Sequence, residues 1–331
     1  MYMKKIGLTF LLICLIGFGT FSCNLSLSQV YPLDPPSNLI YIRSNGEIDP
    51  TETPIQRSDN TYTLQENFLN HTLIIECNNV IINGANYTLS SDLSHHGINI
   101  NQRKNITIKN LNIERFRVGV MISDSSNINI IDNNFSANYY SIRMDYSSFN
   151  VIRGNNIRYQ EGIWLYHSDN NQILNNEISN ANGIKLSTSS GITILRNNLV
   201  GNDPALFLAG TSNVTYYHNN FIDNHANIII TSSKYAGVNF ADNGSMGNYW
   251  SDHVYPDEDG DGIIDVPYVK DENNTDRFPL LYPYDIENDI PSTPTPAPEP
   301  EFPTTMVLVS IIVIAMIGIG VLIYFKKNKK N

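Results

Sequence analysis

The sequence predicts an all-β fold, a right-handed parallel β-helix with coils of about 22 residues, followed by a C-terminal transmembrane helix. Two observations predict it. Pairs of asparagines recur ahead of an apolar residue, and a fixed period of this length is typical of stacked repeats. Their second members lie 22, 20, 22 and 22 residues apart, at Asn134, Asn156, Asn176, Asn198 and Asn220. The second observation is an apolar stretch, 306–325, whose 20 residues are long enough to cross a membrane as a helix.

Each repeat contains three short runs in which apolar and polar residues alternate. Residues 162–165 align with 183–186, a second run such as 171–174 follows, and the asparagine pair completes the coil. Alternation with period 2, bounded by Asn, Ser and Gly, is typical of β-strands. An α-solenoid is excluded because no segment keeps apolar residues spaced three and four apart, as its helices require. A β-propeller is excluded because each of its blades needs about twice this repeat length.

The asparagines predict an amide ladder that satisfies backbone groups at one turn of the solenoid. We assign Asn134 to this ladder. Weaker repeats extend the pattern upstream, so the β-helix is predicted over residues 76–245. Because solenoid ends need covering, we expect an N-terminal cap over 29–75 and a C-terminal cap over 246–285.

Residues 1–28 have the features of a secretory signal peptide. Lys4 and Lys5 precede an apolar core, and small residues follow it. An uncleaved anchor and a lipidated Cys23 are the open alternatives. Besides Cys23, the exported part contains only Cys77, so a disulfide framework is excluded.

The C-terminal region predicts a stalk and a membrane anchor. Residues 286–304 are rich in Pro and Thr and should be extended. The predicted transmembrane helix, 305–325, is followed by a basic tail, 326–331, whose lysines favour the cytoplasmic side. We therefore expect a cell-surface, single-pass membrane protein with the β-helix outside.

The charge of the chain excludes some partners. The formal net charge is −11, and without the six lysines near the two ends it is about −17. Such a surface binds nucleic acid and anionic lipid poorly. Sequons for N-glycosylation occur at Asn24, Asn70, Asn86, Asn105, Asn134, Asn213, Asn243 and Asn273.

An Asp-rich segment after the repeats predicts a structural calcium site. Hard oxygen ligands on a glycine-containing turn are what Ca²⁺ requires. The predicted ligands are Asp257, Asp259, Asp261, Asp265 and the Ile263 carbonyl. Tyr268 stands where a calcium loop usually has a bidentate glutamate, so Asp271 or another segment would complete the shell. An acidic, solvated turn is the alternative interpretation.

Aligned coils predict one outward face with a mixture of aromatic and charged residues. Stacked aromatics beside charged and amide groups suit sugar rings. The candidate ligand-binding residues are Arg143, Asp145, Trp164, Tyr166, His167 and Lys185. The candidate catalytic residues are Arg143, Asp145 and Lys185, although hydrolysis would require two paired acids. An ordinary mixed solenoid surface is the alternative.

Four motifs follow the coils. They are the segment 247–252 (Gly-Asn-Tyr-Trp-Ser-Asp), the Asp-Gly-Asp-Gly loop, 265–268 (Asp-Val-Pro-Tyr) and 276–280 (Asp-Arg-Phe-Pro-Leu). With the coils they resemble the NosD-like parallel β-helix family over roughly residues 38–285, and more narrowly its archaeal cell-surface members. The resemblance implies a carbohydrate-binding or sugar-hydrolase type of β-helix. For NosD itself it implies an accessory role in copper delivery to nitrous-oxide reductase.

We therefore expect a membrane-anchored extracellular module that binds carbohydrate or another cell-envelope component and does not bind nucleic acid. One alternative is a polysaccharide-modifying enzyme, namely a lyase, an epimerase or a hydrolase. Another is a NosD-like copper-handling protein. Copper is not expected, because the histidines are scattered and Met-rich motifs are absent.

Overall fold

The computed structural model of the chain describes residues 38–231 and 237–291. All elements in these two ranges are β-strands. In the described part of the chain, no helix is long and apolar enough to span a bilayer. The predicted signal peptide (1–28), the transmembrane helix (305–325) and the basic tail (326–331) lie outside the described residues.

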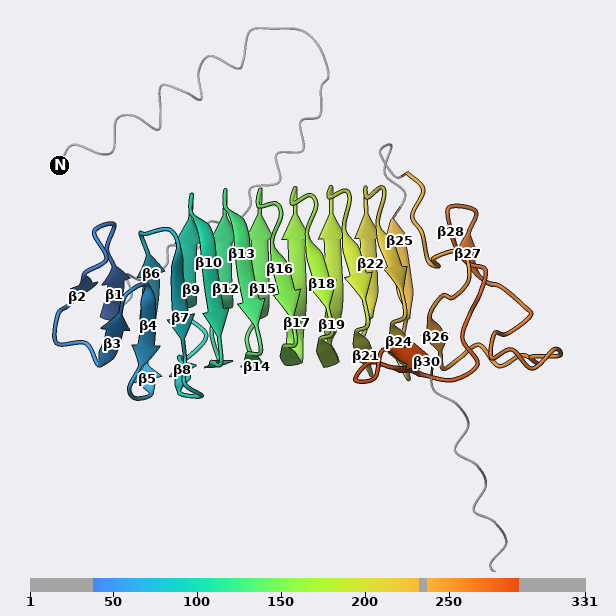
Figure 1. Cartoon of the computed structure of the whole chain (residues 1–331), viewed down its shortest axis with the longest axis horizontal. Helices are drawn as coiled ribbons and strands as arrows, with labels where there is room; N and C mark the ends of the chain where they lie inside the picture. Colours follow the sequence, from blue (N-terminus) through green and yellow to red (C-terminus); the bar gives the residue numbers. More distant parts are fainter. Residues whose placement is uncertain (1–37, 232–236, 292–331) are drawn as a thin grey trace, which may run out of the picture. The chain divides into compact units, whose positions relative to one another are not determined.

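The strands form three ladders that run along the stack of coils (Figure 1). The first comprises β1 (Asn38–Ile42), β6 (His71–Ile75), β9 (His96–Asn101), β12 (Val118–Ser123), β15 (Tyr140–Asp145), β17 (Asn156–Tyr166), β19 (Glu177–Ser187), β22 (Leu206–Ala209) and β25 (Ile228–Thr231). The second comprises β5 (Phe68–Leu69), β8 (Thr88–Ser90), β11 (Asn112–Glu114), β14 (Asn134–Ser136), β21 (Asn198–Val200), β24 (Asn220–Ile222) and β26 (Tyr249–Trp250), and it shares β17 and β19 with the first. The third comprises β4 (Thr61–Leu64), β7 (Val80–Asn83), β10 (Lys104–Lys109), β13 (Ser126–Ile131), β16 (Val151–Arg153), β18 (Gln172–Leu174), β20 (Thr193–Leu195) and β23 (Thr215–Tyr217).

Within these ladders all neighbouring strands are parallel, so the predicted right-handed parallel β-helix with coils of about 22 residues is confirmed. Each coil except the last supplies one strand to each ladder, and β17 and β19 each serve two ladders. The first ladder begins with β1, which pairs in parallel with β6. Regular stacking therefore starts at Asn38, inside the range expected to form the N-terminal cap.

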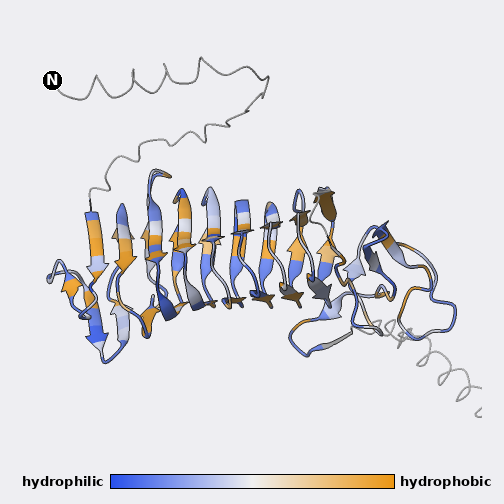
Figure 2. Ribbon diagram, turned by 90° about the horizontal axis from the view of Figure 1, so that it is seen from above, coloured by the Kyte–Doolittle hydropathy of each residue, from blue (hydrophilic) through white to orange (hydrophobic). Residues whose placement is uncertain are grey.

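The core consists of inward columns of branched apolar side chains. In one column Val120, Ile142, Ile163 and Ile184 pair in register from coil to coil, and all four are buried. Each buried side chain of this size contributes roughly 1.5–3 kcal/mol through removal from water. Figure 2 shows the resulting alternation of hydrophobic and hydrophilic bands along the strands.

The asparagine ladder is present, but its inward members are not those that we assigned. Asn134 is exposed, whereas Asn133 is buried. The buried series is Asn133, Asn155, Asn176, Asn197, Asn219 and Asn248. The assignment was wrong because neighbouring residues of an extended strand point to opposite faces. Counting from the second member of each pair therefore selects the outward asparagine in every coil except that of Asn176.

Each ladder asparagine donates its backbone N–H and its Nδ2 to the ladder side chain of the next coil toward the C-terminal end. The backbone N–H and the Nδ2 of Asn155 both donate to Oδ1 of Asn176, at 3.0 Å each. The same Nδ2 also donates to the carbonyl of Ile130 at 2.9 Å. One buried amide thereby forms hydrogen bonds with both the preceding and the following coil, so that backbone groups buried at this turn have partners.

The ladder ends on a buried carboxylate, Asp276. Its Oδ2 accepts the N–H of Asn248 at 2.7 Å and the indole N–H of Trp250 at 2.8 Å. Its Oδ1 accepts the N–H of Phe278 at 3.1 Å. A carboxylate can only accept, so it terminates a chain of donors that all point the same way.

Antiparallel strand pairs flank the stack of coils at both ends. At the first coils, β2 (Ile48–Asp49) pairs with β1, and β3 (Ile55–Ser58) pairs with β4. At the other end, β27 (Tyr268–Asp271) pairs with β28 (Asn274–Asp276), and β29 (Tyr284–Asp285) pairs with β30 (Ile290–Pro291).

Candidate functional site

The predicted outward face lies on the ladder formed by β15, β17, β19 and their neighbours. The strand register places Arg143, Trp164 and Lys185 in one outward column. It places Asp145 and Tyr166 in the next column. The structure thus brings these five candidates together on three successive coils, as the alignment of the repeats predicts.

Trp164 lies between two cations of the flanking strands. The Arg143 Cζ is 4.4 Å from the centre of the indole ring, and the Lys185 Nζ is 4.7 Å from it. The indole N–H donates to Oγ of Ser187 at 3.3 Å. Cation–π contacts of this kind favour the stacked arrangement. A sugar ring that stacked on the face of Trp164 would have to displace one of the two cations.

Two candidate catalytic residues bind each other. The Nε and Nη2 of Arg143 contact Oδ1 and Oδ2 of Asp145, at 3.0 Å each. This bidentate ion pair is partly buried, with side-chain exposures of 29% and 17%. Asp145 would have to leave the pair before it could accept a proton from a substrate.

A second aromatic group surrounds Tyr166 and His167. The ring of His167 stacks on Tyr146, with 5.1 Å between centres and 2° between planes. Tyr166 meets both rings edge-on, at 4.3 Å from His167 and 5.7 Å from Tyr146. Tyr146 was not among the predicted site residues, because its position in the turn gave no repeat signal.

A groove opens beside Lys185, and the sequence analysis missed most of its polar lining. Its volume is about 210 Å³, and Glu161, Asn182 and Phe207 line it with Lys185. Asn182 donates to Oε1 of Glu161 at 2.8 Å. A neighbouring hollow of about 340 Å³ shares Glu161 and Asn182 with this groove and adds Asp203.

Glu161 and Asn182 could have been recognised from their equivalent positions in the aligned repeats. Glu161 and Asn182 form an outward column with Tyr140, immediately before the glycines of two successive coils, Gly162 and Gly183. An added Cβ at Gly183 would lie 2.0 Å from the carbonyl oxygen of the next coil, so the backbone approaches too closely there for a side chain. A polar residue that precedes such a glycine in two successive coils, first Glu161 and then Asn182, could have been selected as a site candidate.

Two titratable side chains at the edge of this face are held neutral. Burial, with the charges of Arg117 and Arg143, lowers the pKa of His96 to about 4. Burial is also the main cause that raises the pKa of Tyr140 to about 12. At neutral pH both side chains therefore offer hydrogen bonds without charge.

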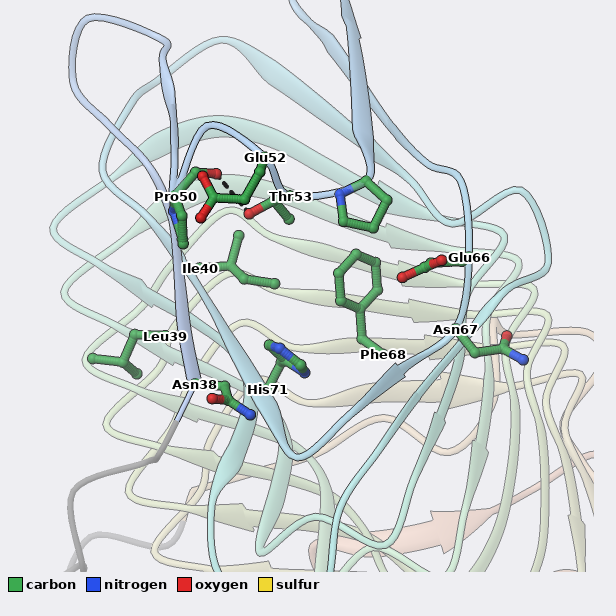
Figure 3. A pocket seen from close by; sticks show the side chains of 11 residues that line it. Asn38, Leu39, Ile40, Pro50, Glu52, Thr53, Glu66, Asn67, Phe68 and His71 are labelled. Carbon is green, nitrogen blue, oxygen red and sulfur yellow. Dashed lines mark hydrogen bonds between the residues drawn. The ribbon is translucent and has the colours of Figure 1, made fainter.

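Another hollow lies away from this face, at the first coils of the β-helix (Figure 3). Its volume is about 360 Å³, and buried Ile40 and Phe68 form its floor. The carboxylates of Glu52 and Glu66 lie on different sides of the Phe68 ring, and His71 lies below it (Figure 3). None of the predicted site residues lines this hollow, and its floor is the end of the apolar core.

The Asp-rich loop brings three of the predicted calcium ligands together. Carboxylate oxygens of Asp257, Asp259 and Asp261 lie within 4.8 Å of one another. The Asp257 carboxylate accepts the N–H groups of Gly260 at 2.7 Å and Gly262 at 2.8 Å. The Gly262 bond is the main cause that holds the pKa of Asp257 below its usual value. Asp257 is therefore ionised at neutral pH, as a calcium ligand must be.

The remaining predicted ligands have other contacts. Asp265 accepts the N–H of Glu258 at 2.7 Å. Asp271 accepts the N–H of Asn273 at 2.9 Å, in the turn between β27 and β28. Ile263 forms an antiparallel bridge with Leu280, which ties the loop to the last coils.

One comparison decides the family. The sequence model of the family described as periplasmic copper-binding protein (NosD) matches residues 47–254. The chain belongs to the NosD family. This agrees with the resemblance of its coils and of the segment 247–252, whereas the archaeal origin stays a prediction. No curated protein matches this NosD-family sequence.

Three solved β-helix structures are similar to this NosD-family chain at low identity. The periplasmic alginate epimerase AlgG is 16% identical with a TM-score of 0.45, covering 54% of this chain and 49% of its own. An alginate lyase from Paenibacillus sp. is 11% identical with a TM-score of 0.36, covering 51% and 86%. A tailspike protein of E. coli bacteriophage HK620, in complex with a pentasaccharide, is 10% identical with a TM-score of 0.24, covering 56% and 51%. The NosD-family chain thus spans about half the length of the epimerase.

The family description raises the question of copper. Among residues 38–231 and 237–291, the one group of three His, Cys, Asp or Glu side chains close enough to share an ion is the aspartate trio of the loop. Copper favours His, Met or Cys ligands. His218, the one buried histidine of the described residues, stacks on Tyr284 with 4.1 Å between ring centres. The described residues therefore do not fit a copper centre.

Proposed function

We propose that this NosD-family protein is a cell-surface β-helix that binds carbohydrate of the cell envelope through its outward face. The observation that carries the proposal is the column of Arg143, Trp164 and Lys185 beside the groove lined by Glu161 and Asn182. Aromatic and polar groups that converge on a hollow are typical of sugar sites. Donors and acceptors are both present, since Lys185 donates and Glu161 accepts.

The ends of the chain support the proposed location. The signal-like segment 1–28, the Pro- and Thr-rich segment 286–304 and the apolar segment 305–325 suit an exported protein that stays anchored. The net charge of about −17 outside the terminal lysines disfavours nucleic acid as a partner. In this proposal the β-helix faces outward and the lysine tail stays in the cytoplasm.

Calcium is part of the proposal as a structural ion. The aspartate trio supplies hard oxygen ligands on a loop that is bridged to the last coils through Ile263 and Leu280. A bound ion would therefore stabilise the C-terminal end of the β-helix without contacting the outward face.

A binding screen tests the proposed function. The full-length protein is applied to an array of neutral and acidic glycans beside a Trp164→Ala, Tyr166→Ala double variant, and every bound glycan is then analysed for products. We expect binding by the wild type and its loss in the double variant. Products would favour a polysaccharide-modifying enzyme that acts through Glu161 or Lys185. No wild-type binding to any glycan would refute the proposal.

A further inference from the structure

The turn between β15 and β16 exposes two aromatic rings at the margin of the proposed face. The exposed fractions of Tyr146 and Phe149 are 57% and 61%. Both residues have a left-handed backbone, with φ of 52° and 60°. This conformation is a genuine outlier for a bulky side chain, so neither burial nor backbone preference explains the aromatic residues.

The equivalent position in other coils shows how unusual Phe149 is. Parallel bridges between Ser126 and Ser148, and between Ser190 and Ser212, fix the equivalence of this turn from coil to coil. The residue that follows the bridging position has a positive φ in every coil compared, Phe149 included. In the other five coils this residue is Asn105, Asn127, Asn170, Gly191 or Asn213. Asn and Gly are the residues that tolerate this backbone conformation. An aromatic residue that replaces them at one coil breaks a local rule, which is typical of functional positions.

One of the two exposed rings, Tyr146, continues the aromatic group of the outward face, and Phe149 lies three residues further along the same turn. Tyr146 stacks on His167 and meets Tyr166 edge-on, as described above. Tyr166 in turn lies edge-on to Trp164, with 6.4 Å between ring centres. An extended ligand on the face can therefore follow aromatic rings from Trp164 to Tyr146, where the turn begins.

The polar groups around this turn are mainly acceptors with negative charge. Asp124 and Asp169 are exposed in the preceding and following coils, and Asp169 also accepts the Phe149 N–H through its carbonyl at 3.4 Å. The nearby cation of Arg143 is bound to Asp145. Sugar hydroxyls can donate to such acceptors, whereas a uronate would meet charges of its own sign.

We propose that the Tyr146–Phe149 turn is a subsite for a neutral sugar ring, which stacks on these aromatics and donates hydroxyl hydrogen bonds to Asp124 and Asp169. This subsite rests on the proposed function, which it deepens by naming the ligand class: neutral hexose polymers rather than polyuronates. The strained aromatic at Phe149 is then retained for binding at the expense of stability.

The test uses Phe149→Asn, which introduces the residue found in four of the five equivalent turns compared above. Binding of full-length protein to hexasaccharides of glucose, mannose, galactose and galacturonic acid is measured by calorimetry, together with thermal midpoints. We expect Phe149→Asn to raise the midpoint and to weaken neutral-sugar binding about five- to ten-fold, the effect of one lost aromatic stack. Phe149→Tyr should keep the affinity.

Leu93→Asn is the matched control, since Leu93 is also apolar, 44% exposed and left-handed with φ of 76°. It should raise the midpoint without changing affinity. Unchanged affinity in Phe149→Asn would overturn the subsite while leaving the proposed function intact. If the wild type bound only the galacturonate oligomer, the neutral-sugar subsite would be overturned and the proposed function would stand. Absence of binding to every probe would overturn both.

Discussion

Asp276 accepts the backbone N–H of Asn248 at 2.7 Å, and with this bond the asparagine ladder passes from amides to a carboxylate. Asp276 is only 1% exposed, yet its two oxygens accept four donors, the others being the Asn248 Nδ2, the Trp250 indole and the Phe278 N–H. A single side chain thereby accepts four hydrogen-bond donors at the C-terminal end of the asparagine ladder.

Replacement of Asp276 by alanine should strongly destabilise the C-terminal coils. Four buried donors would lose their acceptor, and each unsatisfied group costs about 1–3 kcal/mol before relaxation. We expect a loss of at least about 3 kcal/mol in the free energy of unfolding, measured by denaturant titration. Asp223→Asn is the control, because Asp223 is an exposed residue with φ of 49° near the same coils. A loss equal to that of the control would contradict this role.

Asp276 also predicts a pH dependence. Burial raises its pKa from 3.8 to about 6. Since the folded state holds the proton more tightly than the unfolded state, protonation of Asp276 stabilises the fold. This proton-linked stabilisation, which is separate from the acceptor bonds, is complete below about pH 3.8 and is lost as the pH rises through 6. This change in pKa corresponds to a difference on the order of 3 kcal/mol in the free energy of unfolding between low and high pH.

A non-titrating variant isolates this effect from that of the other carboxylates. The thermal midpoints of wild type and Asp276→Asn are compared between pH 4 and pH 7. Relative to the variant, the wild type should become more stable as the pH falls. Parallel curves for the two proteins would show that Asp276 does not titrate in this range.

The two members of one asparagine pair should differ sharply in their contribution to stability. Asn133 accepts the N–H of Leu111 at 3.0 Å and donates to the carbonyl of Ile108 at 3.0 Å, whereas exposed Asn134 donates to Oδ1 of Asn112 at 2.9 Å. Asn133→Ala should cost about 2–4 kcal/mol, and Asn134→Ala less than about 1 kcal/mol. Equal losses in urea unfolding would mean that the buried ladder has no special role.

Removal of calcium should loosen the end of the β-helix that carries the Asp257–Asp261 loop. If the aspartate trio holds an ion, a chelator should lower the thermal midpoint, and added calcium should restore it, because the ion binds only the folded loop. Asp259→Asn should remove this response. A midpoint that is the same with chelator and with calcium would argue for a solvated acidic turn.

The stack around Trp164 should contribute little to folding. A cation–π contact at a partly exposed site contributes about 0.5–1 kcal/mol. Lys185→Met keeps the apolar stem and should change the free energy of unfolding by less than about 1 kcal/mol. A loss of glycan binding in this variant would then report on ligand contact. A drop of several kcal/mol would instead identify Lys185 as a structural residue.

The sequence was sufficient to predict the architecture, because period, alternation and turn residues all repeat. The spacing also placed Arg143, Trp164 and Lys185 in one column, since parallel register follows directly from aligned coils. The spacing did not identify the inward asparagine, because the two members of each pair are the same residue and the sequence does not tell which one faces the core. It also missed the Arg143–Asp145 pair, which depends on side-chain conformation rather than on position.

The groove at Glu161 illustrates a second limit of the sequence analysis. Its walls come from Asn182, Phe207 and Pro204 on later coils, so the hollow exists only after stacking. The Phe149 turn was overlooked for a different reason. A single aromatic in a column of Asn and Gly stands out only once the backbone angles show that the column is left-handed.

The one-way direction of the asparagine ladder has a consequence for how such proteins diverge. Each coil from Asn133 to Asn219 presents the same acceptor to the coil before it and the same donors to the coil after it. A duplicated coil can therefore be spliced in without disturbing the Asp276 terminus, and each one lengthens the outward face by about 4.8 Å. The reach of the surface can thus evolve in fixed increments, independently of the chemistry displayed on it.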